Sequence, residues 1–317
     1  AIQFWERVSI PVFLVIMGFN AANSFKHRGA KSLGEMVSHG YLQRKTRRYV
    51  LPFVLLYLIF IGLGFLSYAI GLTLFSSMAF IPFWGPGIWF VPVVLTAVVV
   101  LPILYRAYIW NPRVTIVLCF AIDLLAQIAL YVLLQGAAAN PAMQDALKFL
   151  FQTNILFYAS AVAMGIWFSD GLELDLKRNR FVWVLLPISL VYLILYQFFS
   201  IRFAFITSDY NLFAFPYSAF LFLLGMRFLP TESQRLLANV ATRVGKATYH
   251  ILMTQILYFS VMFQIFPGIS QIGFGTNVAF YVSYYITNIT LCFLGGILWY
   301  ELEQRLGRPR PPMSTAC

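Results

Sequence analysis

The chain has 317 residues, of which 61% are hydrophobic and only 10% are charged. Soluble domains carry about a quarter charged residues, so this composition excludes a water-soluble globular protein and indicates an integral membrane protein. The formal net charge of +11, from 22 Lys and Arg against 11 Asp and Glu, then tells us which loops face the cytoplasm, and no nucleic-acid partner is expected.

Nine apolar runs follow one another along the chain, each near the roughly 20 residues that a helix needs to cross the hydrocarbon core. They are continuous, whereas transmembrane β-strands would be shorter and would alternate, so we predict an all-α, polytopic transmembrane helical bundle. One membrane domain over residues 1–307 and an unstructured cytoplasmic tail over 308–317 are expected. The predicted spans lie near residues 9–25, 50–71, 88–106, 114–134, 149–169, 181–199, 211–229, 247–266 and 276–299.

The basic residues divide unevenly when they are sorted by alternate loops. Nineteen fall on one side of the membrane, and only Arg7, Lys148 and Arg202 fall on the other. By the positive-inside rule the larger set and the C-terminus are cytoplasmic. Ala1 would then lie outside, and we expect one further helix before it, which gives about ten spans in the complete protein.

The stretch 32–48 leads into the second predicted span. Ser32 and Glu35 have the spacing of a capping box, and apolar residues recur at helical spacing as far as Tyr41. The pattern predicts an amphipathic cytoplasmic helix that runs into the span.

Three arginines, Arg44, Arg47 and Arg48, end this stretch. Arg44 and Arg48 continue the Tyr41 stripe at helical spacing, and Arg47 flanks it. Guanidinium groups held at the membrane face can bind phosphates bidentately. The alternative is a snorkelling, topology-setting cluster that contacts lipid headgroups.

Asp123 is the acidic residue placed in the middle of a span, and Gln127 follows one helical turn later. A carboxylate at this depth usually faces a cavity or a partner. It could orient a base or bind a sugar hydroxyl or a coupling ion; equally, it could be a hydrogen-bonded packing residue between helices. We interpret Asn288, in the last span, as a polar contact between helices.

Histidines and cysteines give no catalytic or metal pattern. His250 lies at the start of a span beside Tyr249, and His27 and His39 lie in a loop. The sequence places no nucleophile or carboxylate beside any of them, so a role at the membrane interface or in solvent is the alternative to catalysis. Neither the histidines nor the three scattered cysteines have metal-ligand spacing, so no metal site is expected.

Four short motifs occur in order along the chain. Residues 10–19 read IPVFLVIMGF, and Arg44 to Arg48 form an R-x-x-R cluster shortly before Pro52. Trp89-Phe90 stands at the head of a span, and residues 245–255 read GKATYHILMTQ. In their order and spacing, these motifs resemble those of acyltransferase family 3, the integral-membrane O-acyltransferases of surface glycans.

This resemblance implies a function. A member would move an acyl group, often acetyl, from cytoplasmic acyl-CoA to a hydroxyl of a surface glycan or lipid-linked sugar, with acyl-CoA as a co-substrate and no permanently bound cofactor. It would be a multi-pass protein of the cell membrane, in contact with membrane lipid. Arg44, Arg47 and Arg48 would bind the CoA phosphates. The candidates for the cavity are Trp89, Tyr249 and Gln255.

Two positions depart from the family pattern, with Met17 where Ser is usual and Gln255 where His is usual. The family's first helix, which carries an Arg and the His taken as catalytic, has no counterpart here. The resemblance therefore implies a base in an upstream helix and leaves Asp123 and His250 as weaker candidates. A glycan or small-molecule transporter and a non-catalytic sensor or assembly subunit are the alternative functions.

Overall fold

The structure is a computed structural model that describes residues 2–69, 89–174, 176–228, 236–265 and 278–306. These residues form helices and connecting loops, and they contain no strand. Each of the nine predicted segments falls on a helix or a helix pair, which confirms the all-α transmembrane fold. Within the described ranges, six helices are long and apolar enough to cross a membrane, and a seventh crossing results if one bent pair counts as a span.

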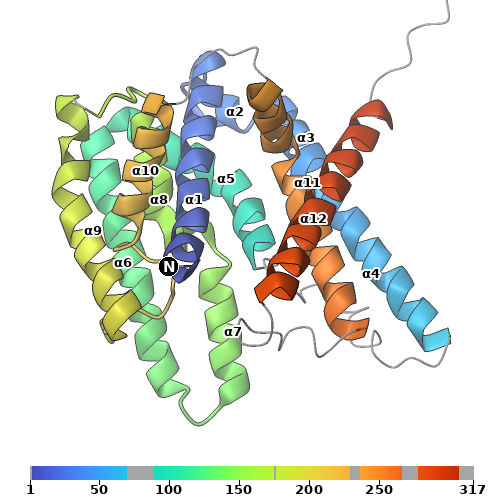
Figure 1. The fold of residues 1–317 in the computed structure, drawn as a ribbon. Coiled ribbons are helices and arrows are strands. Elements are labelled where there is room, and N and C mark those ends of the chain that lie inside the picture. The colour runs from blue at the N-terminus through green and yellow to red at the C-terminus, as the bar shows by residue number, and fades with distance from the viewer. Residues whose placement is uncertain (1, 70–88, 175, 229–235, 266–277, 307–317) are drawn as a thin grey trace, which may run out of the picture. The chain divides into compact units, whose positions relative to one another are not determined.

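The described residues form two compact units, which alternate along the sequence (Figure 1). Unit 1 comprises residues 1–45 and 90–231, and unit 2 comprises residues 46–89 and 232–317. The helices of unit 1 are α1 (Ile2–His27), α2 (Leu33–Met36), α3 (His39–Lys45), α5 (Phe90–Trp110), α6 (Pro112–Gly136), α7 (Pro141–Gln152), α8 (Ala159–Phe168), α9 (Arg180–Phe199) and α10 (Phe215–Phe228). Those of unit 2 are a π-helical turn (Thr46–Val50), α4 (Leu51–Ala69), α11 (Leu236–Ile265) and α12 (Val278–Leu306). The single domain over residues 1–307 stays a prediction, and the tail over 308–317 lies outside the described residues.

Helix α8 is the centre of unit 1, with nine of its ten residues buried. It packs against α1 through a reciprocal pair of glycines. A Cβ atom at Gly18 would collide with the backbone carbonyl of Val162, and one at Gly165 would collide with that of Val15. Small residues of this kind let helix backbones approach closely in membranes, so α1 and α8 are in direct backbone contact.

Asparagine side chains set the starts of several helices in unit 1. Asn111 and Asn140 each precede a proline, and their side chains accept hydrogen bonds from Val114 N (3.2 Å) and Met143 N (3.1 Å). Asn and Pro are favoured at these cap and first-turn positions. Asn154 caps the short 3-10 turn before α8 in the same way, so the predicted span 149–169 is broken into α7 and α8, which are bent by 66°.

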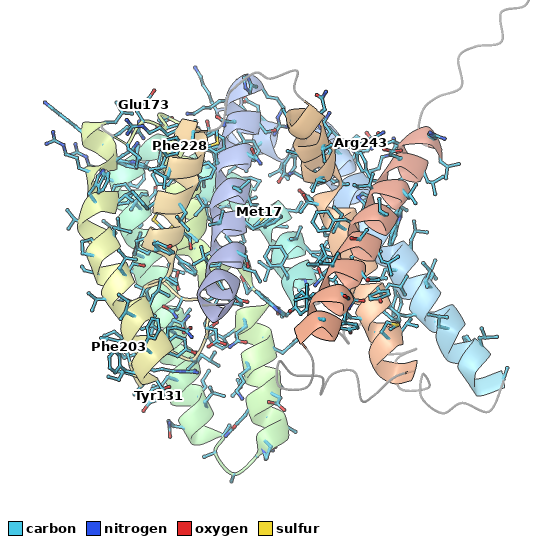
Figure 2. All side chains as sticks on the ribbon, in the orientation of Figure 1. Met17, Tyr131, Glu173, Phe203, Phe228 and Arg243 are labelled. Carbon is cyan, nitrogen blue, oxygen red and sulfur yellow. The ribbon has the colours of Figure 1, made fainter. Side chains whose placement is uncertain are left out.

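The two ends of unit 1 differ in charge. Figure 2 labels Glu173 and Phe228 at one end of the unit, and Tyr131 and Phe203 at the opposite end. The first of these is where α1, α8 and α10 end and where α6 and α9 begin. Most of the basic loop residues of unit 1 belong to the first end, as the sorting by alternate loops predicted. The assignment of that end to the cytoplasm stays a prediction.

Unit 2 is held together by the packing of α11 against α12 and α4. A Cβ atom at Gly296 of α12 would collide with the backbone of Ile251 in α11. Further along the same pair, the Tyr258 hydroxyl donates a hydrogen bond to Asn288 Oδ1 (2.5 Å). This bond confirms the interpretation of Asn288 as a polar contact between helices.

The stretch 32–48 is only partly the predicted helix. Its first turn, α2, is separate, whereas α3 and the π-helical turn continue without a break from His39 into α4, as predicted. The capping box is present, since Glu35 N donates to Ser32 Oγ (3.3 Å) and Ser32 N donates to Glu35 Oε2 (3.2 Å). However, α2 ends at Met36, and α3 begins at His39. Gly34 and Gly40 weaken a continuous helix here, and the burial of Tyr41, whose hydroxyl donates to the Val98 carbonyl (2.8 Å), decides where α3 lies.

Candidate functional site

A buried polar cluster in unit 1 surrounds Asp123. This residue is fully buried in α6, and its Oδ2 atom accepts a hydrogen bond from the Ser160 hydroxyl of α8. Its second oxygen, Oδ1, has no hydrogen-bond partner among the described residues. A buried acceptor without a partner is costly and is often satisfied by water or by a ligand. Of the two carboxylate oxygens of Asp123, Oδ2 is thus hydrogen-bonded within the described residues and Oδ1 is not.

Gln127, one turn further along α6, is buried and incompletely bonded in the same way. Its Oε1 atom accepts hydrogen bonds from the backbone N–H (3.2 Å) and the hydroxyl (3.1 Å) of Thr207. The orientation of the amide is fixed because a backbone N–H only donates, and Nε2 remains without a partner in the described part of the chain. Gln127 Nε2 is thus an unused donor and Asp123 Oδ1 an unused acceptor among the described residues.

A second buried polar pair lies in unit 2, between α11 and α12. His250 Nε2 is 2.7 Å from Glu303 Oε2, and the imidazole is only 3% exposed. The rings of Trp299 and Tyr300 lie edge-to-face with it, at centroid distances of 5.9 and 5.3 Å. Because a carboxylate only accepts, this hydrogen bond places a proton on Nε2. In the neutral imidazole Nδ1 is then an acceptor, and it has no partner among the described residues.

Glu303, Ser160 and Thr207 are the partners that the sequence analysis missed. Ser160 and Thr207 belong to segments far from α6 in the sequence, and no local pattern indicates them. Glu303 could have been found, since His250 lies near the start of one predicted span and Glu303 follows the end of the next. Consecutive antiparallel spans bring such positions to the same end of a helix pair.

The three predicted cavity residues all belong to unit 2. The buried Tyr249 donates a hydrogen bond to the Tyr49 carbonyl (3.0 Å), and its ring packs edge-to-face on that of Tyr49 at 5.1 Å. Gln255 is half-buried in α11, and Trp89 is half-buried directly before α5. A cavity that joins Trp89, Tyr249 and Gln255 stays a prediction.

The three predicted donor-binding arginines are exposed. Arg44 lies in the last turn of α3 in unit 1, whereas Arg47 and Arg48 lie in the π-helical turn of unit 2. The π-helical turn interrupts the α-helical repeat on which the predicted stripe rested, and π-helical turns often occur at functional sites. The Arg48 guanidinium lies 5.5 Å from the centroid of the Tyr49 ring. That the three form one binding site stays a prediction.

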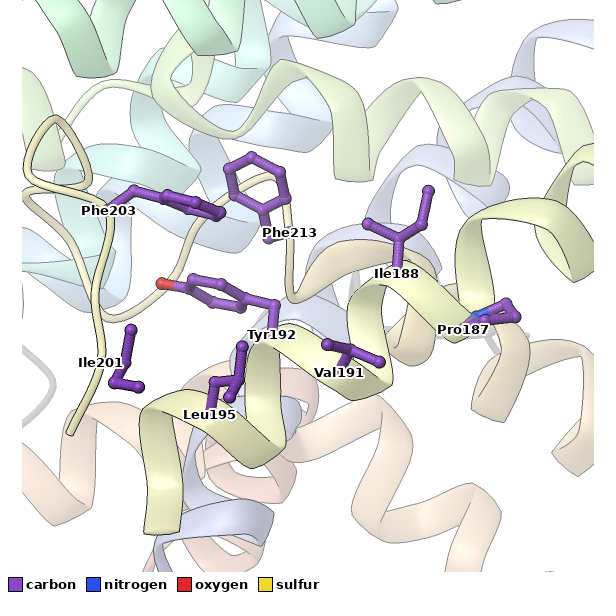
Figure 3. Close-up of a pocket in the computed structure, with 8 residues that line it drawn as sticks. All are labelled: Pro187, Ile188, Val191, Tyr192, Leu195, Ile201, Phe203 and Phe213. Carbon is purple, nitrogen blue, oxygen red and sulfur yellow. The ribbon is translucent and has the colours of Figure 1, made fainter. Parts of the chain in front are cut away.

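An apolar pocket of about 370 Å³ lies on α9 and the loop that follows it (Figure 3). Tyr192, Phe203 and Phe213 form its aromatic side, with the Tyr192 and Phe203 rings stacked at 5.9 Å. The Tyr192 hydroxyl accepts a hydrogen bond from Asn211 (3.1 Å). The lining residues that the structure describes include no charged group, so this pocket offers no acid or base for chemistry.

The described residues include no group of three or more His, Cys, Asp or Glu that could hold a metal ion. In the comparisons with known proteins, a family model described as "Acyltransferase domain" matches residues 1–297. Nothing matches among the curated proteins or the solved structures. The family match covers the described residues of both units, up to the last turns of α12.

Proposed function

This chain belongs to acyltransferase family 3, and we propose that it is a membrane-bound O-acyltransferase that uses acyl-CoA on the cytoplasmic side. The acceptor would be a hydroxyl of a surface glycan or lipid-linked sugar, and acetyl is the first acyl group to test. The observation that carries the proposal is the family match over residues 1–297. The multi-pass helical bundle, in which one end of unit 1 gathers most of its basic loops, supports it.

Arg44, Arg47 and Arg48 are the proposed donor site. All three are exposed, and none of them forms an ion pair within the described part of the chain. Their guanidinium groups are therefore available to the phosphates of CoA, for which arginine is suited by its planar, bidentate geometry.

Asp123 and Gln127 are the proposed contacts for an acceptor hydroxyl. Their unused Oδ1 and Nε2 atoms are one acceptor and one donor, and a hydroxyl group both accepts and donates. Binding of the hydroxyl here would satisfy both atoms and hold the oxygen for attack.

The reaction itself needs a base. The hydroxyl oxygen would attack the thioester carbonyl, its proton would pass to the base, and CoA would leave as the thiolate. The resemblance implies a His in a helix before residues 10–19. Within the described residues, the two candidates are His250, which Glu303 orients (2.7 Å), and Asp123.

Titration of the purified protein in lipid nanodiscs with acetyl-CoA tests the donor site. Replacement of Arg44, Arg47 and Arg48 together by Gln should weaken binding at least roughly tenfold, because charge-assisted hydrogen bonds to phosphate are lost. A matched control replaces Arg106, Arg180 and Arg305, which are also exposed, by Gln and should bind normally.

Release of the CoA thiol in the presence of glycan acceptors then tests transfer. No acetyl-CoA binding by the unchanged protein would contradict the proposed donor and favour a transporter. Binding without thiol release would favour a non-catalytic sensor. An equal loss of acetyl-CoA affinity in the two triple variants would show that the arginine cluster contributes only through the general surface charge.

A further inference from the structure

A basic pocket of about 550 Å³ opens on unit 1 between the beginnings of α6 and α9, beside the end of α8. Arg113, Lys177 and Arg178 are the charged residues among its described lining, and no acidic residue is among them. Three positive charges around one pocket attract an anion, and they repel each other when it is empty.

Arg178 is held in place by a network of hydrogen bonds. It donates to Asp170 Oδ2 (3.1 Å), to the Tyr108 hydroxyl (2.9 Å) and to the Trp167 carbonyl (3.1 Å), and its guanidinium lies 4.7 Å from the centroid of the Trp167 ring. Asp170 also accepts a hydrogen bond from Lys26. One carboxylate is thus shared by two cations, so it does not neutralise both.

Asp170 nevertheless remains ionised at neutral pH. Burial raises the pKa of its carboxyl, but hydrogen bonds from Lys26, Tyr108 and Arg178 outweigh burial and bring the pKa below its ordinary value. The network therefore keeps its charges, and Arg178 is a rigid, cationic wall of the pocket.

Arg113 and Lys177 are exposed, and neither forms an ion pair with a residue that the structure describes. Arg113 is the second residue of α6, and Lys177 lies just before α9. The start of a helix carries partial positive charge, so cations are unfavourable there and anions are favourable. An anion between the two helix starts would relieve this repulsion.

Below the cations the walls of the pocket are apolar. Val117, Phe120, Phe181 and Leu185 line it along α6 and α9, and both helices lie in candidate membrane spans. Val117 is 67% exposed in the monomeric chain, as expected of a side chain that faces lipid. The cationic residues of the pocket thus lie where the two spans begin, and its apolar residues lie further along these spans.

We propose that this pocket binds one anionic phospholipid, with its headgroup phosphate between Arg113, Lys177 and Arg178 and an acyl chain along the apolar walls. Basic pockets between transmembrane helices bind anionic headgroups in this manner, and the charge at the rim favours an anionic lipid over a zwitterionic one. The site is independent of the acyl-transfer proposal, since it uses none of the residues proposed for that reaction.

Native mass spectrometry of the full chain with added phosphatidylglycerol or phosphatidylcholine tests the proposal. The unchanged protein should retain one phosphatidylglycerol in preference to phosphatidylcholine. Replacement of Arg113 and Lys177 by Gln should weaken phosphatidylglycerol binding about 20- to 30-fold, at roughly fivefold for each cation at the membrane surface. Arg178 is left unchanged because its network also supports the fold.

The matched control replaces Arg106 and Arg180 by Gln, two exposed cations of unit 1 that do not line the pocket. It should bind phosphatidylglycerol like the unchanged protein, and a thermal melt should show both variants folded. Equal weakening in the two variants, or equal retention of the two lipids, would overturn the proposal. Displacement of the lipid by excess acetyl-CoA would overturn it too, since the occupant would then be the acyl donor.

Discussion

The two units hold their closest helix pairs together by different means. In unit 1, α1 and α8 meet through Gly18 and Gly165, each facing the backbone of the other helix. In unit 2, only α12 contributes such a glycine, Gly296. The pair with α11 adds polar contacts between side chains, namely Tyr258–Asn288, His250–Glu303 and Arg243–Glu301. Polar side chains supplement the glycine contact in both units: along the helix pair in unit 2, and at the end of α8 in unit 1, where Lys26 of α1 donates to the Ser169 carbonyl (2.8 Å).

The largest expected effect is loss of the His250–Glu303 pair. Replacement of His250 by Leu leaves the Glu303 carboxylate, whose side chain is 12% exposed, without its partner. Breaking a buried pair in this way costs about 3 kcal/mol or more of unfolding free energy. Replacement of Glu303 by Gln is the control, since its amide oxygen still accepts from Nε2 and should cost roughly 1 kcal/mol or less.

Denaturant unfolding of both variants in detergent micelles would measure these values. Similar stability of His250→Leu and Glu303→Gln would show that this pair contributes little to the packing of α11 against α12.

Replacement of Gly165 by Ala tests the backbone contact of unit 1. The new methyl group would collide with the backbone carbonyl of Val15, which cannot move aside as a side chain can, so we expect a loss of about 2 kcal/mol. Gly225 in α10 is the matched control, because a Cβ atom there meets nothing within 4 Å. The same change at Gly225 should stabilise by roughly 0.5–1 kcal/mol.

Thermal melts of the two alanine variants, measured in the same detergent, should therefore shift in opposite directions. A Gly165→Ala protein as stable as the unchanged one would mean that α1 and α8 are further apart than the structure places them.

The smallest effect concerns the Asp123 cluster. Removal of the Ser160 hydroxyl by Ala deletes the side-chain hydrogen bond to Asp123 Oδ2 and should cost about 1–2 kcal/mol. Replacement of Asp123 by Asn should cost less, because the amide oxygen still accepts from Ser160. Unfolding curves that rank the two variants in the opposite order would indicate that Asp123 carries a charge which the fold requires.

Much of the fold could be predicted because hydropathy alone marks membrane spans. The positions at which helices are interrupted were harder to predict. Asn154, a typical cap residue, stands inside the predicted span 149–169 and was a visible sign that the helix restarts there. The end of α2 and the start of α3 depend on the burial of Tyr41, which packs against Phe25 of α1 and donates to the Val98 carbonyl of α5. These are contacts between segments that no local pattern reveals.

The candidate site was predictable only in part. The exposure of Arg44, Arg47 and Arg48 follows from charge, and the depth of Asp123 follows from its place in an apolar run. The hydrogen bonds within the candidate site could not be predicted in this way. Gln127 bonds to Thr207, 80 residues later, and His250 bonds to Glu303, 53 residues later. Such pairs are decided by which helices pack together.

Helix α8 has a consequence for the way the protein is made. Its ten residues span about 15 Å, half of the hydrocarbon core, and it is enclosed by other helices. Its neighbours α1, α5 and α6 all precede it in the chain, and Thr96 of α5 accepts a hydrogen bond from Ile155 N (3.1 Å) just before it. Since synthesis proceeds from the N-terminus, α8 leaves the ribosome after α1, α5 and α6, and α9 and α10 pack against it later.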